Sequence, residues 1–223
     1  MKKNFLISTG GSGGHVIPAT ILYDHLSETN NIIISTDKRG LKYLDKDKYK
    51  LKIIDTPKLD NIFFLPFNLI KILFLTVKCF FLIKKNKIEK VFSTGGYMSL
   101  PIILAARLSH LNFFLIEPNQ VLGRANKYFL NSCEKIFCYT EKIKNFPEGF
   151  KNKIVTIKPL VRKHIYELIS TSRNKNKFTL LVVGGSQGAN IFDNNLKNSI
   201  VNISKKFPIK IIHQTNKKNI SYL

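Results

Sequence analysis

A glycine-rich turn near the start of the chain is the first group of residues that could do chemistry. The sequence GGSGGH at residues 10–15 follows an apolar run at residues 5–8 and precedes a helical pattern that begins near Pro18 and continues toward Leu26. Glycine allows positive φ angles and close approach to a ligand, and the N–H groups at a helix start suit a phosphate. The turn lacks the lysine of a P-loop and the glycine spacing of dinucleotide-binding turns, so it predicts neither an ATPase nor an NAD site.

Two further glycine-rich loops follow apolar runs later in the chain. They are GGY at residues 95–97 and GGSQGA at residues 184–189. Ligands bind at the carboxyl ends of strands in open parallel sheets, so the three loops are expected to line one crevice. His15 ends the first of these loops and Glu117 follows the apolar run at residues 113–116, and both side chains are of types that can act as a base. Each also has a plain structural interpretation, His15 as a helix-start residue and Glu117 as the end of a strand.

The elements that must position these residues follow from the pattern of apolar runs. The runs lie at residues 5–8, 32–34, 51–54, 91–93, 113–116, 136–139, 154–157 and 178–183. Helical patterns such as residues 101–108 separate them, and continuous apolar strands indicate a parallel sheet covered on both faces. A polar stretch at residues 171–177 precedes a second strand–glycine–helix unit. We therefore predict an α/β chain, with a complete domain at residues 1–160 and the start of a second Rossmann-like domain at residues 161–223.

The apolar segment at residues 62–83 admits three interpretations. It is long enough to span a membrane, but Lys71 and Lys78 fall inside it and Pro66 interrupts it. A lysine cluster follows at once, which suits a helix at a membrane surface. The third interpretation is a domain helix packed on the sheet. In each case, residues 61–87 are expected to be at least partly helical.

Composition narrows the possible partners. The chain has 36 lysine and arginine residues against 14 acids, a net charge of +22, which favours anionic lipid, phosphorylated substrates or nucleic acid. The lysines are scattered, which compositional drift also explains, and no nucleic-acid recognition motif is present, so no nucleic-acid partner is expected. Cys79, Cys133 and Cys138 show no paired spacing and predict neither disulfides nor a zinc site. The apolar run after Met1 is too short for a signal peptide.

The motifs, in this order and spacing, resemble those of the MurG family of bacterial glycosyltransferases. They are GGSGGH at 10–15, GGY at 95–97, IEPN at 116–119, KPLVR at 158–162, GGSQGA at 184–189 and HQT at 213–215. Four positions depart from the usual family residues. Ile116 and Pro118 stand in place of His and Gln, and Lys158 and Pro159 in place of Gly and Asn.

The resemblance implies a GT-B fold of two doubly wound domains and a specific reaction. N-acetylglucosamine would pass from UDP-GlcNAc to lipid I, the undecaprenyl-pyrophosphate-linked acceptor, with inversion and without a metal or cofactor. The product, lipid II, serves peptidoglycan synthesis. The enzyme would be a peripheral membrane protein on the cytoplasmic side of the bacterial inner membrane.

The resemblance also implies roles for single residues. Ser12, Gly13 and Gly14 would face the diphosphate, Asn119 the donor sugar, and Arg162 and Ser186 the nucleotide diphosphate. Gly10, Gly11, Gly95, Gly96 and Tyr97 would lie on the acceptor side. His15 and Glu117 are the candidate bases.

An alternative function belongs to a different class. Family members continue well past Leu223, into residues that contact the uracil, the ribose and the sugar. The chain by itself is therefore expected to transfer GlcNAc slowly. It could instead be a non-catalytic remnant or a split half that binds the lipid-linked acceptor or the membrane surface.

Overall fold

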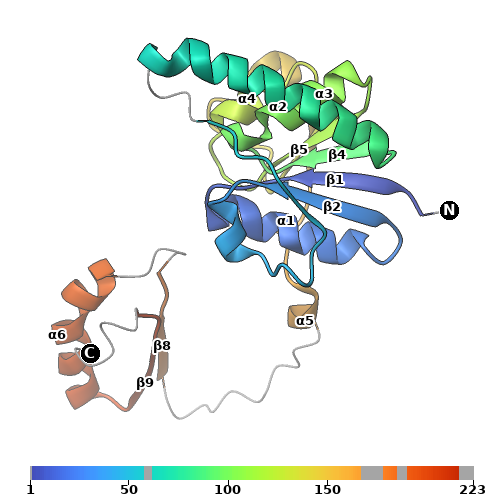
Figure 1. Ribbon diagram of the computed structural model, residues 1–223. Coiled ribbons are helices and arrows are strands. Elements are labelled where there is room, and N and C mark those ends of the chain that lie inside the picture. The colour runs from blue at the N-terminus through green and yellow to red at the C-terminus, as the bar shows by residue number, and fades with distance from the viewer. Residues whose placement is uncertain (1, 58–61, 167–177, 185–189, 216–223) are drawn as a thin grey trace. The chain divides into compact units, whose positions relative to one another are not determined.

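The computed structural model describes residues 2–57, 62–166, 178–184 and 190–215 (Figure 1). The chain divides into two compact units, Met1–Glu167 and Leu168–Leu223. The first unit contains the two glycine-rich loops at residues 10–14 and 95–97, and the second begins after the KPLVR segment. The sequence-based boundary after residue 160 stays a prediction.

A seven-stranded parallel sheet forms the centre of the first unit. Its order is β3-β2-β1-β4-β5-β6-β7. The strands are β1 (Asn4–Ser8), β2 (Asn31–Thr36), β3 (Leu51–Ile53), β4 (Lys90–Ser93), β5 (Phe113–Glu117), β6 (Lys135–Cys138) and β7 (Ile154–Thr156). The predicted parallel sheet is confirmed, with β1, β4 and β5 side by side. Because β1 lies between β2 and β4, the strand order reverses beside it, and the loop at residues 10–14 follows the strand at this switch point.

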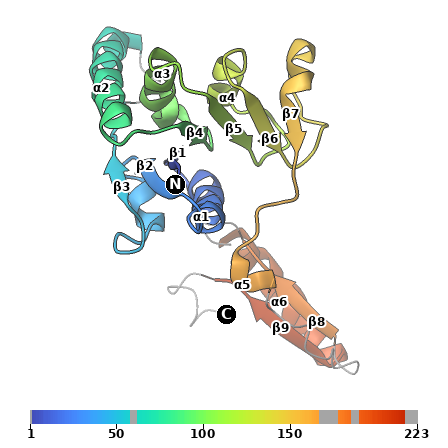
Figure 2. The same cartoon turned by 90° about the vertical axis from the view of Figure 1, so that its right-hand side faces the viewer.

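Helices cover both faces of the sheet (Figure 2). They are α1 (Gly13–Leu26) on one face, and α2 (Leu65–Lys85), α3 (Leu100–Leu108) and α4 (Arg124–Phe129) on the other. Successive strand residues point to opposite faces. Thus Leu6 packs in the core under α2 and α3, while its neighbour Ile7 packs against Val16 of α1. Both β1 side chains are fully buried, which explains why the strands are continuous apolar runs.

Helix α1 begins earlier than the prediction near Pro18. It starts at Gly13, directly after the glycine-rich turn, and Pro18 lies inside it. The N–H groups of His15 and Val16 both bond to the Ser12 carbonyl, so the turn itself leads into the helix. Proline lacks a backbone N–H and is usually found in the first turn of a helix. In α1 the proline lies in the second turn instead.

Helix α2 is continuous, because Pro66 lies in its first turn rather than interrupting it. By length and composition this helix could cross a membrane. One face nevertheless packs on the core of the first unit, through Ile72, Leu75, Thr76, Cys79 and Ile83. The opposite face exposes Phe67, Ile70, Leu73, Phe74, Val77 and Phe81. The structure confirms the predicted helix, which packs on the sheet through one face and exposes an apolar patch on the other.

The second unit contains one strand–helix–strand motif in its described residues. Strands β8 (Phe178–Val182) and β9 (Ile209–His213) pair in parallel, and helix α6 (Asn190–Lys206) connects them. The carboxylate of Asp193 is buried, lies 3.0 Å from His213 Nε2 and accepts a hydrogen bond from the Thr215 hydroxyl at 2.7 Å. This motif agrees with the predicted start of a Rossmann-like domain.

The first unit also contains short helices, namely η1 (Gly40–Tyr43), η2 (Ile62–Phe64), η3 (Tyr97–Ser99), η4 (Glu148–Lys153) and α5 (Lys163–Tyr166).

Candidate active site

The turn at residues 10–14 connects β1 to the start of α1. Ser12 is the N-cap residue of the helix, and within the described residues its hydroxyl makes no capping hydrogen bond. Ser12 and Gly14 are exposed, while Gly13 is buried. The first N–H groups of a helix have no acceptor within the helix and carry partial positive charge. The turn therefore offers an accessible hydroxyl and backbone donors to an anionic group.

A buried carboxylate holds this turn in place. Asp37 Oδ1 accepts hydrogen bonds from the N–H of Gly11 at 2.8 Å and of Gly40 at 2.9 Å. Asp37 Oδ2 accepts from Arg39 Nε at 2.9 Å. Asp37 is only 1% exposed, so these bonds form in a low-dielectric setting where they are strong. Sequence reasoning missed Asp37; an acid directly after the β2 strand, at the sheet edge that carries the loops, was the available signal.

His15 connects the first glycine-rich turn to the second. Its Nδ1 lies 2.6 Å from the carbonyl oxygen of Thr94, which precedes Gly95. Because a carbonyl only accepts, Nδ1 must donate, and in the neutral ring Nε2 then keeps its lone pair. The Thr94 hydroxyl in turn bonds to that of Thr9 at 2.8 Å, after β1. The arrangement fixes the imidazole in a tautomer that can take a proton.

The second loop requires glycine at Gly96. Its φ is +83°, and a Cβ there would overlap the sulfur of Met98. The same Cβ position lies 3.8 Å from His15 Cδ2, so the loop passes directly beside the imidazole. Tyr97 follows, with its ring 4.9 Å from the Arg39 guanidinium carbon. The structure thus brings together the predicted residues of both loops.

Glu117 is buried at 2% exposure, and both of its carboxylate oxygens are occupied. Oε1 accepts from the N–H of Asn119 at 3.2 Å and from Asn119 Nδ2 at 3.0 Å. Oε2 accepts from the N–H of Gly123 at 2.8 Å and from Asn126 Nδ2 at 3.0 Å. These four donors favour Glu117 as the residue that shapes the loop after β5 and orients exposed Asn119, rather than as the base.

Arg162 does not lie beside the glycine-rich turn. The carbonyl oxygen of its neighbour Val161 lies 3.2 Å from His25 Nε2, and Lys163 forms an ion pair with Glu28. Both partners lie at the carboxyl end of α1, whose 14 residues make the helix about 21 Å long. The predicted contact of Arg162 with the nucleotide diphosphate stays a prediction. Ser186 lies outside the described residues, and Gly184 belongs to the second unit, so the predicted crevice of three loops also stays a prediction.

The sequence that forms this sheet and its loops matches a family of glycosyltransferases. Residues 5–138 match the glycosyltransferase family 28 N-terminal domain, and the chain belongs to that family. This match spans β1 to β6 and includes His15, Asp37, Gly96 and Glu117.

Individual relatives of the chain have names that give a more specific reaction than the family does. The chain is 49% identical over 98% of its length to the UDP-N-acetylglucosamine–N-acetylmuramyl-(pentapeptide) pyrophosphoryl-undecaprenol N-acetylglucosamine transferase of Pelagibacter ubique, and covers 62% of that protein. The transferase of the same name from Rickettsia canadensis is 36% identical over 96% of the chain, which covers 60% of it. The crystal structure of Acinetobacter baumannii MurG has the same fold, with a TM-score of 0.74 at 24% identity, over 99% of this chain and 63% of that one. The chain thus spans about three fifths of the curated relatives that it matches.

Proposed function

We propose that this chain supplies the acceptor-binding part of an enzyme that transfers N-acetylglucosamine from UDP-GlcNAc to lipid I. The product would be lipid II, the precursor used in peptidoglycan synthesis. The names of the relatives from Pelagibacter and Rickettsia support this reaction. The observation that carries the proposal is the hydrogen bond from His15 to Thr94, because it prepares a base beside two glycine-rich loops.

The chemistry needs a base and a site for departing charge. The acceptor hydroxyl attacks the anomeric carbon of GlcNAc, the bond to UDP breaks, and UDP leaves with the electron pair. In this proposal His15 Nε2 takes the hydroxyl proton. Ser12, Gly13 and Gly14 direct the helix start of α1 toward diphosphate oxygens, where fixed dipoles stabilise developing charge. Glu117 holds Asn119 in position for the sugar.

An exposed apolar surface on α2 supports the proposal that the acceptor is lipid-linked. Phe67 and Phe74 are 71% and 69% exposed on the outer face of the helix. Lys71 and Lys78 lie on the same helix and are exposed. Apolar side chains beside lysines suit the surface of an anionic bilayer. We propose that this face binds the cytoplasmic side of the inner membrane and makes the chain a peripheral membrane protein.

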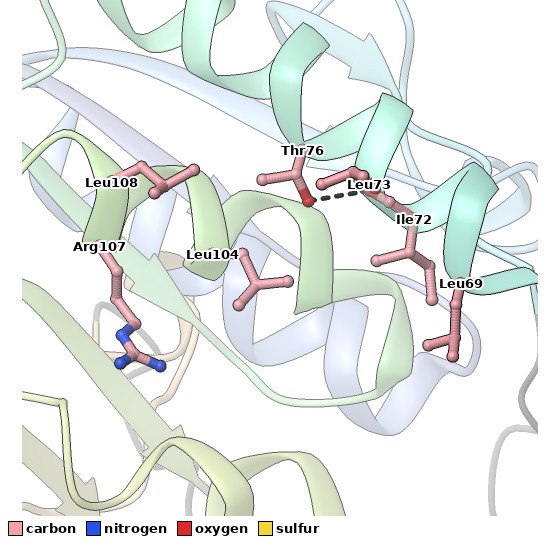
Figure 3. A pocket seen from close by; sticks show the side chains of 7 residues that line it. All are labelled: Leu69, Ile72, Leu73, Thr76, Leu104, Arg107 and Leu108. Carbon is pink, nitrogen blue, oxygen red and sulfur yellow. Dashed lines mark hydrogen bonds between the residues drawn. The ribbon is translucent and has the colours of Figure 1, made fainter.

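A groove of about 570 Å³ between α2 and α3 adjoins this surface (Figure 3). It is lined by Leu69, Ile72, Leu73, Thr76, Leu104, Arg107 and Leu108. The Thr76 hydroxyl already donates to the Ile72 carbonyl at 2.8 Å, so the α2 side of the groove is effectively apolar. The groove suits part of a hydrocarbon chain.

A transfer assay tests the reaction and separates it from the alternative of a non-catalytic half. The purified chain would be incubated with radiolabelled UDP-GlcNAc and a lipid I analogue. A hybrid of residues 1–223 with the C-terminal part of the Pelagibacter relative would be assayed beside it. The proposal expects analogue binding by the chain and label transfer by the hybrid. Binding without transfer by the hybrid supports the non-catalytic half. If the chain does not bind the analogue, acceptor binding is overturned for the enzyme and for the non-catalytic half alike.

Vesicle co-sedimentation tests the membrane surface. The double substitution Phe67→Ser and Phe74→Ser should reduce binding to vesicles that contain phosphatidylglycerol. Ile53→Ser on β3, also an exposed apolar residue at 51%, is the matched control and should bind normally. Equal binding by the double variant and the control would refute this surface.

A further inference from the structure

Arg39 lies at the edge of the first glycine-rich turn, and the sequence-based predictions give this cation no role. Its Nε and Nη2 atoms both lie 2.9 Å from Asp37 Oδ2. Its guanidinium carbon lies 4.9 Å from the centre of the Tyr97 ring. The Asp37 side chain is 2% exposed, whereas the Arg39 side chain is 44% exposed. Arg39 therefore has one edge fixed in the protein and another open to solvent.

These contacts make the guanidinium a prepared anion site rather than a mobile surface cation. A side chain that is already ordered loses little entropy when a ligand binds. Asp37 uses the Nε and Nη2 edge, so the N–H groups of Nη1 point away from that carboxylate. A guanidinium presents donors in a rigid fork that matches phosphate oxygens.

Gly11 of the first glycine-rich turn lies next to Arg39. A Cβ on Gly11 would lie 3.6 Å from Arg39 Nη2 and 2.8 Å from Met98 Cε. Gly11 has φ +76°, and its N–H donates to the same Asp37 that holds Arg39. One carboxylate therefore sets both the backbone of the turn and the position of the cation. The shared hydrogen bonds to Asp37 therefore hold Arg39 beside the turn, and its guanidinium lies next to the ring of Tyr97.

Tyr97 also connects this cation to the apolar groove. It begins η3, which leads directly into α3, and Leu104 and Leu108 of α3 line the groove. The nine residues of α3 extend about 13 Å. A ligand with a diphosphate at Arg39 and an apolar chain along α3 would satisfy both features.

We infer that Arg39 binds the diphosphate of a polyprenyl-diphosphate ligand, with Asp37 as its positioning residue. The inference rests on the proposed function and adds to it the group that recognises the charged part of the acceptor. Two negative phosphates beside one another suit a fixed guanidinium, whose planar fork of N–H donors can bind two phosphate oxygens at once.

Titration calorimetry with farnesyl diphosphate and farnesyl monophosphate tests this inference on the 223-residue chain. The variants are Arg39→Gln, Arg39→Lys and the control Lys38→Gln. Lys38 is the adjacent cation, 76% exposed and paired with Asp55 at 3.5 Å. Arg39→Gln should weaken farnesyl diphosphate binding about tenfold or more and remove the preference for diphosphate over monophosphate. Arg39→Lys should retain part of that preference, and Lys38→Gln should bind within about twofold of the original chain.

The outcomes separate this inference from the proposed function. Arg39 has no recognition role if the Arg39→Gln variant binds farnesyl diphosphate as tightly as the original chain does. The same conclusion follows if the variant loses equal affinity for the diphosphate and the monophosphate. In both cases the proposed function stands. If the original chain binds neither ligand, acceptor binding and the inference both fail. Unfolding curves for each variant show whether the fold is retained, and Arg39→Lys provides the second measurement should Arg39→Gln not fold.

Discussion

The imidazole Nδ1 of His15 donates to the carbonyl oxygen of Thr94 at 2.6 Å, and this bond joins the start of α1 to the loop after β4. The two residues are 79 positions apart in sequence. They meet because β1 and β4 are adjacent and parallel, so both strands end at the same edge of the sheet. The bond assigns the lone pair to Nε2, and it makes the ring part of both loops.

His15→Asn should slow transfer strongly while preserving the loops. The asparagine amide can still donate toward Thr94, but it has no basic nitrogen in place of Nε2. A general base contributes about 100- to 10,000-fold, so kcat of the hybrid enzyme should fall within that range, with acceptor binding unchanged. His110→Asn, in an exposed turn, is the control. Full activity in His15→Asn would show that another group takes the proton.

Glu117→Gln should destabilise the first unit. The amide NH₂ would face N–H groups that now donate to a carboxylate, leaving buried donors unsatisfied. We expect a loss of about 2–3 kcal/mol in the free energy of unfolding, measured by urea denaturation. Glu148→Gln removes an exposed ion pair with Lys151 and should change stability by less than about 1 kcal/mol. Similar losses of unfolding free energy in the two variants would contradict the role of Glu117 in holding the loop after β5.

Gly96→Ala should also be destabilising. Its positive φ costs a residue with a Cβ about 1–2 kcal/mol, and Met98 must move as well. Gly149→Ala provides a matched substitution, because a Cβ there meets nothing within 4 Å. Thermal melting should show a lower Tm for Gly96→Ala and an equal or higher Tm for Gly149→Ala. The opposite order would mean that the loop does not require glycine.

The buried thiols should be unreactive in the folded chain. Burial raises the pKa of Cys79 and of Cys138 to about 12, and it also raises the pKa of Cys133. The thiolate is the reactive form, so Ellman's reagent at pH 8 should react slowly until guanidinium is added. Rapid reaction of the native chain would show that these sites are open to solvent.

The raised thiol pKa values also predict how stability changes with pH. Above pH 9.0 an unfolded cysteine ionises while folded Cys79 stays protonated, so stability decreases as pH rises from 9.0 toward 12. Between pH 8 and pH 10 one such thiol contributes a loss of about 1.4 kcal/mol. Cys79→Ala should therefore lose less stability over that interval in urea denaturation. An identical loss in both proteins would contradict the assigned pKa.

The parallel sheet and its glycine-rich loops could be predicted because they depend on local patterns. A continuous apolar run such as residues 5–8 indicates a strand buried on both faces, and GGY after a strand indicates a loop at the sheet edge. Proline was misleading in both helices. Pro18 lies inside α1, and Pro66 lies in the first turn of α2. The start of a helix depends on backbone hydrogen bonds, and the position of a proline alone does not specify them.

The sequence by itself determined the α/β class, the loops and the identity of His15 as a candidate base. Only the tertiary structure decided what the acids do. Asp37 and Glu117 are both acids that directly follow or end a strand, yet neither sequence position reveals which donors surround it. Folding brings Gly11, Arg39 and Gly40 to Asp37, and Asn119, Gly123 and Asn126 to Glu117. A carboxylate becomes a brace or a base according to its burial and its donors, and both depend on how separate loops pack at the sheet edge.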